Sequence, residues 1–216
     1  MRYAAVIFDF DYTLGDATDA IVAGYTAGLT GLGWPAPERE AVRRTVGLPL
    51  ELGYTWLTGD QDPAHQGEFR RLFTQVAHPM QAAGVPLFPG AAELLEGLRA
   101  AGVHTGIVST KRAVVLEEAL APHPCARCLE FIIGGDQVSA SKPDPEGLNA
   151  ALARLGLKPE QALYVGDTVI DAETAQRAGT DFVPVLNGAT PAEDFDIWPH
   201  QMVAEDLAQL RVWLGV

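Results

Sequence analysis

The stretch that decides the fold is Ala4-Ala5-Val6-Ile7-Phe8-Asp9-Phe10-Asp11-Tyr12-Thr13-Leu14, an apolar run that ends in two acids. Short continuous apolar runs bounded by polar residues are typical of buried strands in parallel sheets, where chemistry gathers beyond the carboxyl ends of the strands. Two carboxylates one residue apart repel each other unless a cation or a shared proton intervenes. Asp9 and Asp11 are therefore candidate active-site residues. The segment alone is equally compatible with two acids that only close the strand as turn or capping residues.

Four further apolar runs predict buried strands, with leucines at helical spacing in the segments between them. This alternation predicts an α/β fold with a parallel sheet and helices on both of its faces. Pro184 cannot donate to a strand ladder, so we expect the last strand at an edge of the sheet. The predicted strands are Val103 to Ser109, Leu129 to Ile133, Ala162 to Val165 and Phe182 to Leu186.

The interval from Gly15 to Gly84 interrupts the alternation, because its periodicity is helical throughout and its breaks are rich in glycine and proline. We therefore expect one domain formed by residues 1–14 and 85–216 and an inserted helical domain over residues 15–84. The helices predicted in the insertion are Ala20 to Leu32, Glu38 to Val46, Leu50 to Leu57 and Glu68 to Ala82.

The overall charge restricts the class of partner. The 216 residues include 28 acidic and 15 basic side chains, for a formal net charge of -13. Because nucleic-acid binding needs a basic face, no nucleic acid is expected. No apolar run is long enough to span a bilayer and the N-terminus has no signal-peptide pattern, so we expect a cytoplasmic protein with no membrane partner. A monomer and a homodimer are both compatible with the sequence.

Cysteine and histidine predict no metal centre. Cys125 and Cys128 form a single C-x-x-C, and a zinc site would need a second pair of ligands, so we expect two reduced cysteines in a loop. His65, His78 and His104 show no ligand spacing.

Two further predicted strand ends carry groups suited to phosphate. Ser109 and Thr110 stand immediately before a predicted helix, where hydroxyls and free backbone N–H groups suit a phosphate, although an ordinary helix cap is the simpler interpretation. Lys142 precedes Pro143, which holds the lysine in a stiff turn where its charge can stabilise a phosphoryl group. A solvated surface lysine is the ordinary alternative.

The fourth predicted strand also ends in acids. Gly166 permits a tight turn there, Asp167 follows it, and Asp171 comes one helical turn later, although acids that cap a helix would explain Asp167 alone. Four strand ends then bring acids, hydroxyls, a lysine and more acids to one edge of the sheet. Because Mg²⁺ prefers a few carboxylates together with water and substrate oxygens, this set predicts a magnesium-dependent phosphoryl-transfer site.

The order of these motifs resembles the haloacid dehalogenase superfamily over nearly the whole chain. Asp9-Phe10-Asp11-Tyr12-Thr13-Leu14 is similar to its first motif, Ser109 to its second, Lys142 within Ser141-Lys142-Pro143-Asp144-Pro145 to its third, and Gly166-Asp167-Thr168-Val169-Ile170-Asp171 to its fourth. The helical insertion resembles the cap of phosphoglycolate phosphatase-like members. The resemblance implies a Rossmann-like five-stranded parallel sheet with strand order 3-2-1-4-5 and an inserted α-helical cap.

The resemblance also implies a role for each residue at the site. Asp9 would be the nucleophile that forms an aspartyl-phosphate, and Asp11 the acid and base. Asp9, Asp167 and the backbone carbonyl of Asp11 would hold Mg²⁺, with Asp171 supporting the ion directly or from behind. Ser109 and Lys142 would bind the transferring phosphoryl group, beside Thr110.

These roles imply hydrolysis of a phosphate monoester of a small metabolite, phosphoglycolate among the candidates. The acid at position 11 favours phosphate esters over halides. Pyrophosphate hydrolysis and sugar-phosphate mutation on the same fold stay open, as does a non-catalytic binding module.

Some positions depart from the family pattern or leave substrate recognition open. Tyr12 stands where most phosphatase members have glycine, so it either narrows the entrance or faces the cap. Thr110-Lys111 follows Ser109, where asparagine is common. In the cap, a guanidinium near Gly47-Leu48-Pro49-Leu50 could bind a substrate carboxylate, although a solvated helix face is the simpler interpretation for each arginine there. The arginines concerned are Arg39, Arg43 and Arg44.

Overall fold

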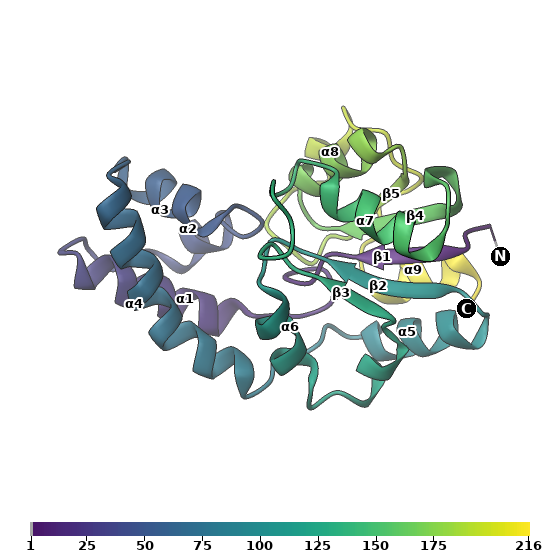
Figure 1. Ribbon diagram of the computed structural model, residues 1–216, viewed down its shortest axis with the longest axis horizontal. Helices are drawn as coiled ribbons and strands as arrows, with labels where there is room; N and C mark the ends of the chain where they lie inside the picture. Colours follow the sequence, from purple (N-terminus) through teal and green to yellow (C-terminus); the bar gives the residue numbers. More distant parts are fainter. Residues whose placement is uncertain (1) are drawn as a thin grey trace.

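The computed structural model describes residues 2–216, which form a five-stranded parallel sheet in the order β3-β2-β1-β4-β5 (Figure 1). The predicted strand order is confirmed, and Pro184 lies on an edge strand as expected. The strands are β1 (Ala5–Phe8), β2 (His104–Val108), β3 (Phe131–Ile133), β4 (Ala162–Gly166) and β5 (Asp181–Pro184).

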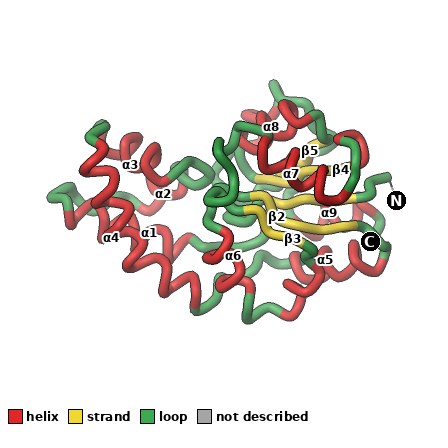
Figure 2. Tube along the Cα trace, viewed as in Figure 1, coloured by secondary structure: helices red, strands yellow, loops and turns green. Residues whose placement is uncertain are grey.

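The central strand β1 is buried on both faces, which explains its continuous apolar sequence. In register, Phe8 pairs with Ile107 of β2 on one side and with Val165 of β4 on the other. Because all strands run parallel, the segments that follow Phe8, Val108 and Val165 emerge at the same edge of the sheet (Figure 2). This edge carries the polar residues predicted to be functional.

Helices cover both faces of the sheet. On one face α5 (Ala91–Ala100), α6 (Ala113–Leu120) and α9 (Leu207–Leu214) contribute leucines to a core that includes Val6 and Phe8. On the other face α7 (Glu146–Leu155) and α8 (Val169–Ala178) pack against Ile7 and Tyr164. Short 3-10 helices span Pro124–Cys128, Pro159–Gln161 and Ala192–Phe195.

The helical insertion forms a bundle to one side of the sheet (Figure 1). Its helices are α1 (Thr18–Gly31), α2 (Arg39–Arg43), α3 (Leu50–Thr58) and α4 (Pro63–Ala82). The bundle has an aromatic core in which Phe69 stacks against Tyr25 and Tyr54, with ring centroids 5.2 and 4.9 Å apart. Gly28 allows the close approach of α1 and α4, since a Cβ there would lie 2.5 Å from the Phe69 ring.

Two helices of the bundle have a boundary that differs by more than two residues from the sequence expectation. The helix predicted over Glu38 to Val46 is only Arg39–Arg43, because the chain turns ahead of Gly47, whose φ is +93°. The last helix begins at Pro63 rather than Glu68, because Asp62 accepts a hydrogen bond from the Ala64 N–H and proline suits the first helical position.

The two chain segments that join the bundle to the sheet lie side by side. The Asp16 N–H donates to the Pro86 carbonyl at 2.8 Å, and the Phe88 N–H donates to the Leu14 carbonyl at 2.9 Å. This pairing fixes the entry and exit of the insertion close to the end of β1.

The remaining expectations concern cysteine, histidine and the membrane. Cys125 and Cys128 are buried and free, and they lie in the 3-10 helix Pro124–Cys128 rather than in an open loop. The histidines named in the sequence analysis each contact a carboxylate: Asp60, Glu118 and Glu130. Across residues 2–216, every helix is too short or too polar to cross a membrane.

Candidate active site

Asp9 lies directly beyond the end of β1 and is buried. Its backbone N–H donates to the Val165 carbonyl at 2.9 Å, which extends the ladder one residue past the strand. Within residues 2–216, the next backbone N–H groups, those of Phe10 and Asp11, have no hydrogen-bond acceptor, and neither does the N–H of Thr110 after β2. Free N–H donors beside a buried carboxylate can bind an anionic substrate group.

Lys142 links two of the predicted acids. Its ammonium lies 2.6 Å from Oδ1 of Asp171 and 3.1 Å from Oδ1 of Asp9, and all three side chains are buried. The contact with Asp9 has an ion-pair distance without hydrogen-bond alignment, so Oδ1 of Asp9 lacks a hydrogen-bond partner within the described residues. The Lys142–Pro143 peptide bond is cis. The solvated-surface interpretation of Lys142 is wrong, because its side chain is enclosed among acids.

Tyr164 is a buried polar residue of the site that the sequence analysis did not single out. Its hydroxyl donates to the Val108 carbonyl at 2.9 Å and lies 3.1 Å from Oδ1 of Asp171, and it accepts from Lys142 at 3.2 Å. The available signal was a tyrosine in the fully buried strand β4, since a buried hydroxyl needs a partner. Tyr164 thereby helps to hold the Lys142 ammonium in position.

Asp171 anchors the turn after β4 and forms a capping box with Thr168 at the start of α8. Its Oδ2 accepts from the Thr168 N–H at 3.1 Å and from the Thr168 hydroxyl at 2.6 Å, while Oδ1 accepts from Lys142 and lies 3.1 Å from the Tyr164 hydroxyl. Gly166 is required beside it, because a Cβ at that position would lie 2.4 Å from the Asp171 side chain. Both oxygens of Asp171 are therefore already engaged by protein groups.

Asp167 has more free capacity to bind a cation. It is buried, and its Oδ1 accepts one hydrogen bond from the Thr13 hydroxyl at 3.3 Å. Oxygens of Asp9, Asp167 and Asp171 lie within 4.8 Å of one another. Buried carboxylate oxygens with unfilled lone pairs are the ligands that Mg²⁺ prefers, so this donor set fits a divalent cation held mainly by Asp9 and Asp167.

The electrostatics of the cluster favour an added positive charge. Burial raises the pKa of Asp9 to about 6, with Lys142 opposing the increase and Asp171 adding to it. Burial, reinforced by Asp171 and Asp9, raises the pKa of Asp167 well above its ordinary value. Burial alone would lower the pKa of Lys142, but Asp171 and Asp9 raise it well above its usual range. Three buried acids therefore face a single ammonium, and a bound cation would relieve their repulsion.

The hydroxyls after β2 are near the site, but they do not cap a helix. Ser109 is buried and its hydroxyl lowers the pKa of Asp9, while Thr110 lines the cavity described below. The following helix α6 begins only at Ala113, whose N–H donates to Asp136 at 2.8 Å. The expectation of a helix start immediately after Thr110 is therefore wrong, and the free N–H of Thr110 is the donor that this loop offers.

Asp11 is paired with Lys111, which belongs to the Thr110-Lys111 departure from the family pattern after Ser109. Lys111 lies 3.0 Å from Oδ2 of Asp11, and both side chains are largely buried. Oδ1 of Asp11 is buried without a hydrogen-bond partner in the described part of the chain. Lys111 therefore fixes one oxygen of the carboxyl group and leaves the other free for a substrate or water.

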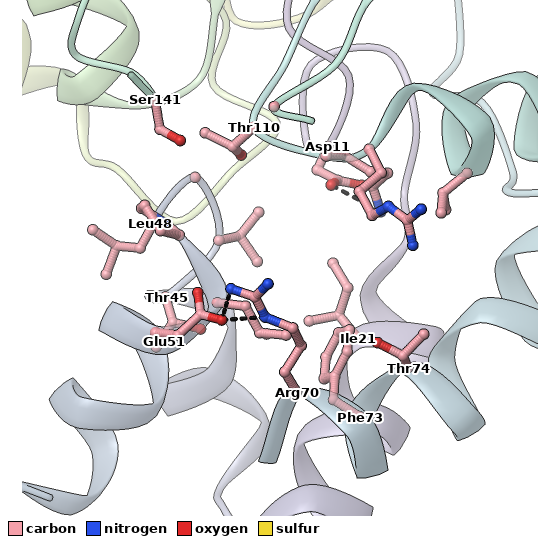
Figure 3. A pocket seen from close by; sticks show the side chains of 18 of the residues that line it. Asp11, Ile21, Thr45, Leu48, Glu51, Arg70, Phe73, Thr74, Thr110 and Ser141 are labelled. Atoms are coloured by element: carbon pink, nitrogen blue, oxygen red, sulfur yellow. Dashed lines mark hydrogen bonds and ion pairs between the residues drawn. The ribbon is translucent and has the colours of Figure 1, made fainter. Parts of the chain in front are cut away.

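A cavity of about 440 Å³ lies between the helical bundle and this edge of the sheet (Figure 3). Asp11, Thr110 and Ser141 line it from the sheet side, and Leu48 and Phe73 line it from the bundle. Arg70 of α4 also lines it and is hydrogen-bonded to Glu51, a pair that the sequence analysis did not identify. Arg39, Arg43 and Arg44, for which the sequence left a solvated helix face as the simpler interpretation, are absent from its lining within residues 2–216.

Tyr12 faces the bundle rather than the cavity. It has a φ of +58°, a left-handed conformation that explains why glycine is common there, and its side chain is buried. The Thr18 hydroxyl lies 2.9 Å from the Tyr12 hydroxyl. The guanidinium of Arg43 lies 5.3 Å from the ring centroid and donates to the Gly188 carbonyl at 3.4 Å. Tyr12 therefore packs between the strand end and α2.

Tyr12→Gly is expected to destabilise the protein by about 2–4 kcal/mol, because the loss of a buried ring outweighs the relief of the left-handed conformation. Urea unfolding measures the difference. The control Tyr12→Phe keeps the ring and should lose only about 1 kcal/mol with the hydroxyl contact. A glycine variant as stable as the wild type would show that the ring contributes no net stability.

Comparisons with known proteins agree with this geometry. Residues 6–185 match the family model of haloacid dehalogenase-like hydrolases. The chain is 29% identical over 232 aligned positions to the phosphoglycolate phosphatase of Salmonella typhimurium, covering 98% of this chain and 92% of that protein.

Solved structures give the same result. A structure described as a haloacid dehalogenase-like hydrolase from Bacteroides fragilis has a TM-score of 0.93 and 36% identity, covering 96% of this chain and 99% of the other. A second structure, described as a phosphoglycolate phosphatase from Lactobacillus plantarum, has a TM-score of 0.86 and 27% identity, covering 97% of this chain and 98% of the other. The chain therefore belongs to the haloacid dehalogenase-like hydrolases, on the phosphatase side of that family.

Proposed function

We propose that this protein hydrolyses a phosphate monoester of a small metabolite through an aspartyl-phosphate on Asp9, with Mg²⁺ as cofactor. The observation that carries the proposal is the buried cluster in which Lys142 lies between Asp9 and Asp171, with Asp167 alongside; Asp11, two residues after Asp9, lines the cavity. Residues 15–84 act in this proposal as a cap that covers the cavity.

In the first step a carboxylate oxygen of Asp9 attacks the phosphorus, and the bond to the ester oxygen breaks. The leaving alcohol takes a proton from the carboxyl group of Asp11, whose Oδ1 is free for this contact. Lys142, Ser109 and the N–H of Thr110 would hold the phosphoryl oxygens and stabilise their charge.

In the second step Asp11 takes a proton from water, and the water oxygen attacks the phosphorus of the aspartyl-phosphate. The bond to Asp9 breaks, inorganic phosphate leaves and the carboxylate is restored. Mg²⁺ bound by Asp9, Asp167 and the Asp11 carbonyl would supply positive charge for the phosphoryl group. Asp171 acts through its bonds to Lys142 and Thr168, because both of its oxygens are already engaged.

A panel of phosphate esters, pyrophosphate among them, tests the proposal in the presence of Mg²⁺ and in EDTA. We expect release of phosphate from one or more monoesters and its loss in EDTA. Phosphoglycolate is the first ester to assay, because the curated relatives are phosphoglycolate phosphatases. Release from pyrophosphate alone, isomerisation of a sugar phosphate without release, or no reaction with any compound would each contradict the proposal.

Metal removal should make stability depend on pH in a specific direction. The folded, metal-free protein favours the protonated form of Asp9, whose pKa is raised to about 6, and of Asp167, whose pKa is raised well above its ordinary value. An acid whose pKa is raised on folding contributes stability below its unfolded pKa, and this contribution is lost as pH rises through the folded pKa. In EDTA the melting temperature is therefore expected to fall between pH 5 and pH 8.

Mg²⁺ should offset this loss, so the difference in melting temperature between Mg²⁺ and EDTA is expected to grow over the same pH range. Differential scanning fluorimetry measures both curves. The variant Asp167→Asn removes a proposed ligand and should abolish the difference. A difference that shrinks with rising pH would contradict a magnesium site formed by these carboxylates.

A further inference from the structure

Every basic side chain that lines the cavity is already paired with a carboxylate. On the bundle side, Arg70 is hydrogen-bonded to Glu51, and both residues line the cavity (Figure 3). On the sheet side, Lys111 lies 3.0 Å from Asp11. The other basic residues of the lining are likewise paired, Arg112 with Asp136 at 3.7 Å and His78 with Glu118 at 2.5 Å.

This pairing disfavours a substrate whose leaving group is an anion. A carboxylate on the leaving group would have to displace Glu51 from Arg70 or Asp11 from Lys111, and the displaced carboxylate would then lie in the cavity without a cation. The net charge of -13 adds a weaker, long-range repulsion of anions. The phosphoryl group itself would bind elsewhere, at Lys142 and the proposed metal site.

The rest of the lining suits an uncharged molecule. Side chains such as Leu48, Phe73 and Val115 form an apolar wall. Gln81 of α4 lines the cavity and is 4% exposed. The Gln81 amide can both donate to and accept from a hydroxyl of a ligand in the cavity.

The size of the cavity favours a leaving group larger than glycolate. A volume of about 440 Å³ lies in the range of pockets that enclose ligands much larger than glycolate. Glycolate would leave the apolar wall and Gln81 uncontacted, because it offers only a short chain and a carboxylate.

We infer that the leaving group of the substrate is an uncharged alcohol larger than glycolate. The inference rests on the proposed phosphomonoesterase function and narrows it: the chain is similar in sequence to phosphoglycolate phosphatases, but its cavity selects against the carboxylate of phosphoglycolate. Glu51 is the specificity-determining residue, because it neutralises the one guanidinium that reaches the cavity from α4.

Two esters of matched size test the charge preference. 2-Phosphoglycolate and 2-hydroxyethyl phosphate differ only in a carboxylate against a hydroxymethyl group. For the wild-type enzyme with Mg²⁺ we expect kcat/KM to be at least about tenfold higher for 2-hydroxyethyl phosphate, whose leaving group is uncharged. Among larger esters with uncharged leaving groups, such as glucose 6-phosphate, ribose 5-phosphate and glycerol 3-phosphate, at least one should have a higher kcat/KM than both. A higher kcat/KM for 2-phosphoglycolate than for every ester with an uncharged leaving group would overturn the inference.

The variant Glu51→Gln tests the assigned residue by a gain of activity. Removal of its charge frees Arg70, so the ratio of kcat/KM for 2-phosphoglycolate to that for 2-hydroxyethyl phosphate should rise about five- to tenfold. The matched control is Glu68→Gln, which changes the net charge equally and frees Arg71, one position along α4 and outside the cavity lining of the described residues. The control should leave the ratio within about twofold of wild type. An equal change in both variants, or in neither, would overturn the role of Glu51.

Binding separates this inference from the proposed function. If no ester is hydrolysed, the proposed function fails, and calorimetric titration of the wild-type protein with the same two esters then decides the charge preference. Tighter binding of 2-hydroxyethyl phosphate supports an uncharged ligand, whereas tighter binding of 2-phosphoglycolate, or equal binding of the two, overturns it.

Discussion

Replacement of Asp9 by asparagine is expected to reduce phosphate release by about 10⁴-fold or more, because an amide cannot form the acyl phosphate. The substitution keeps the shape of a buried side chain whose pKa burial already raises to about 6, so the fold should persist. Lys142 retains Asp171 as a partner 2.6 Å away. The measurement is steady-state phosphate release with Mg²⁺, accompanied by circular dichroism to verify folding.

The matched control for Asp9→Asn is Asp19→Asn. Asp19 is an exposed acid that pairs with Arg39 at the surface of the bundle, and its side chain is 82% exposed. Its substitution should leave phosphate release within about twofold. Phosphate release by folded Asp9→Asn within tenfold of wild type would exclude Asp9 as the nucleophile.

Lys142→Met is expected to lower both stability and activity. The substitution leaves Asp9 and Asp171 buried without their shared cation, and breaking a buried ion pair from one side typically costs about 3–5 kcal/mol. The loss of fixed positive charge beside the phosphoryl group should reduce kcat by about 10²–10³-fold. Urea unfolding in EDTA and phosphate release with Mg²⁺ measure the two effects separately.

The pH dependence of the Lys142→Met stability loss distinguishes this cause from a packing defect. The acids can take up protons at pH 5, so the destabilisation should be smaller there than at pH 8. Lys158→Met is the control, because Lys158 is exposed and its substitution should change stability by less than about 0.5 kcal/mol. A stability loss in Lys142→Met that is equal at both pH values would indicate lost packing instead.

Much of the fold was predictable because its signals are local. The continuous apolar sequence of β1 reflects burial on both faces, and Pro184 marked an edge strand because a proline cannot donate to a ladder. The helical insertion was visible from periodicity and from breaks at glycine and proline. The helix start at Pro63 does not follow from apolar periodicity, because its signal is the capping residue Asp62 followed by a proline at the first helical position.

The sequence by itself determined which side chains gather at one edge of the sheet, because parallel strands necessarily end together and the motifs follow strands. Only the tertiary structure decided how these side chains are used. Tyr164 contacts Lys142, Lys111 pairs with Asp11, and Arg70 rather than Arg39, Arg43 or Arg44 lines the cavity. Tyr164 and Lys111 have their partners on other segments of the sheet domain, whereas Arg70 reaches the cavity from the bundle. That arrangement arises from packing between residues far apart in the chain, so no local pattern of charge or hydrophobicity records it.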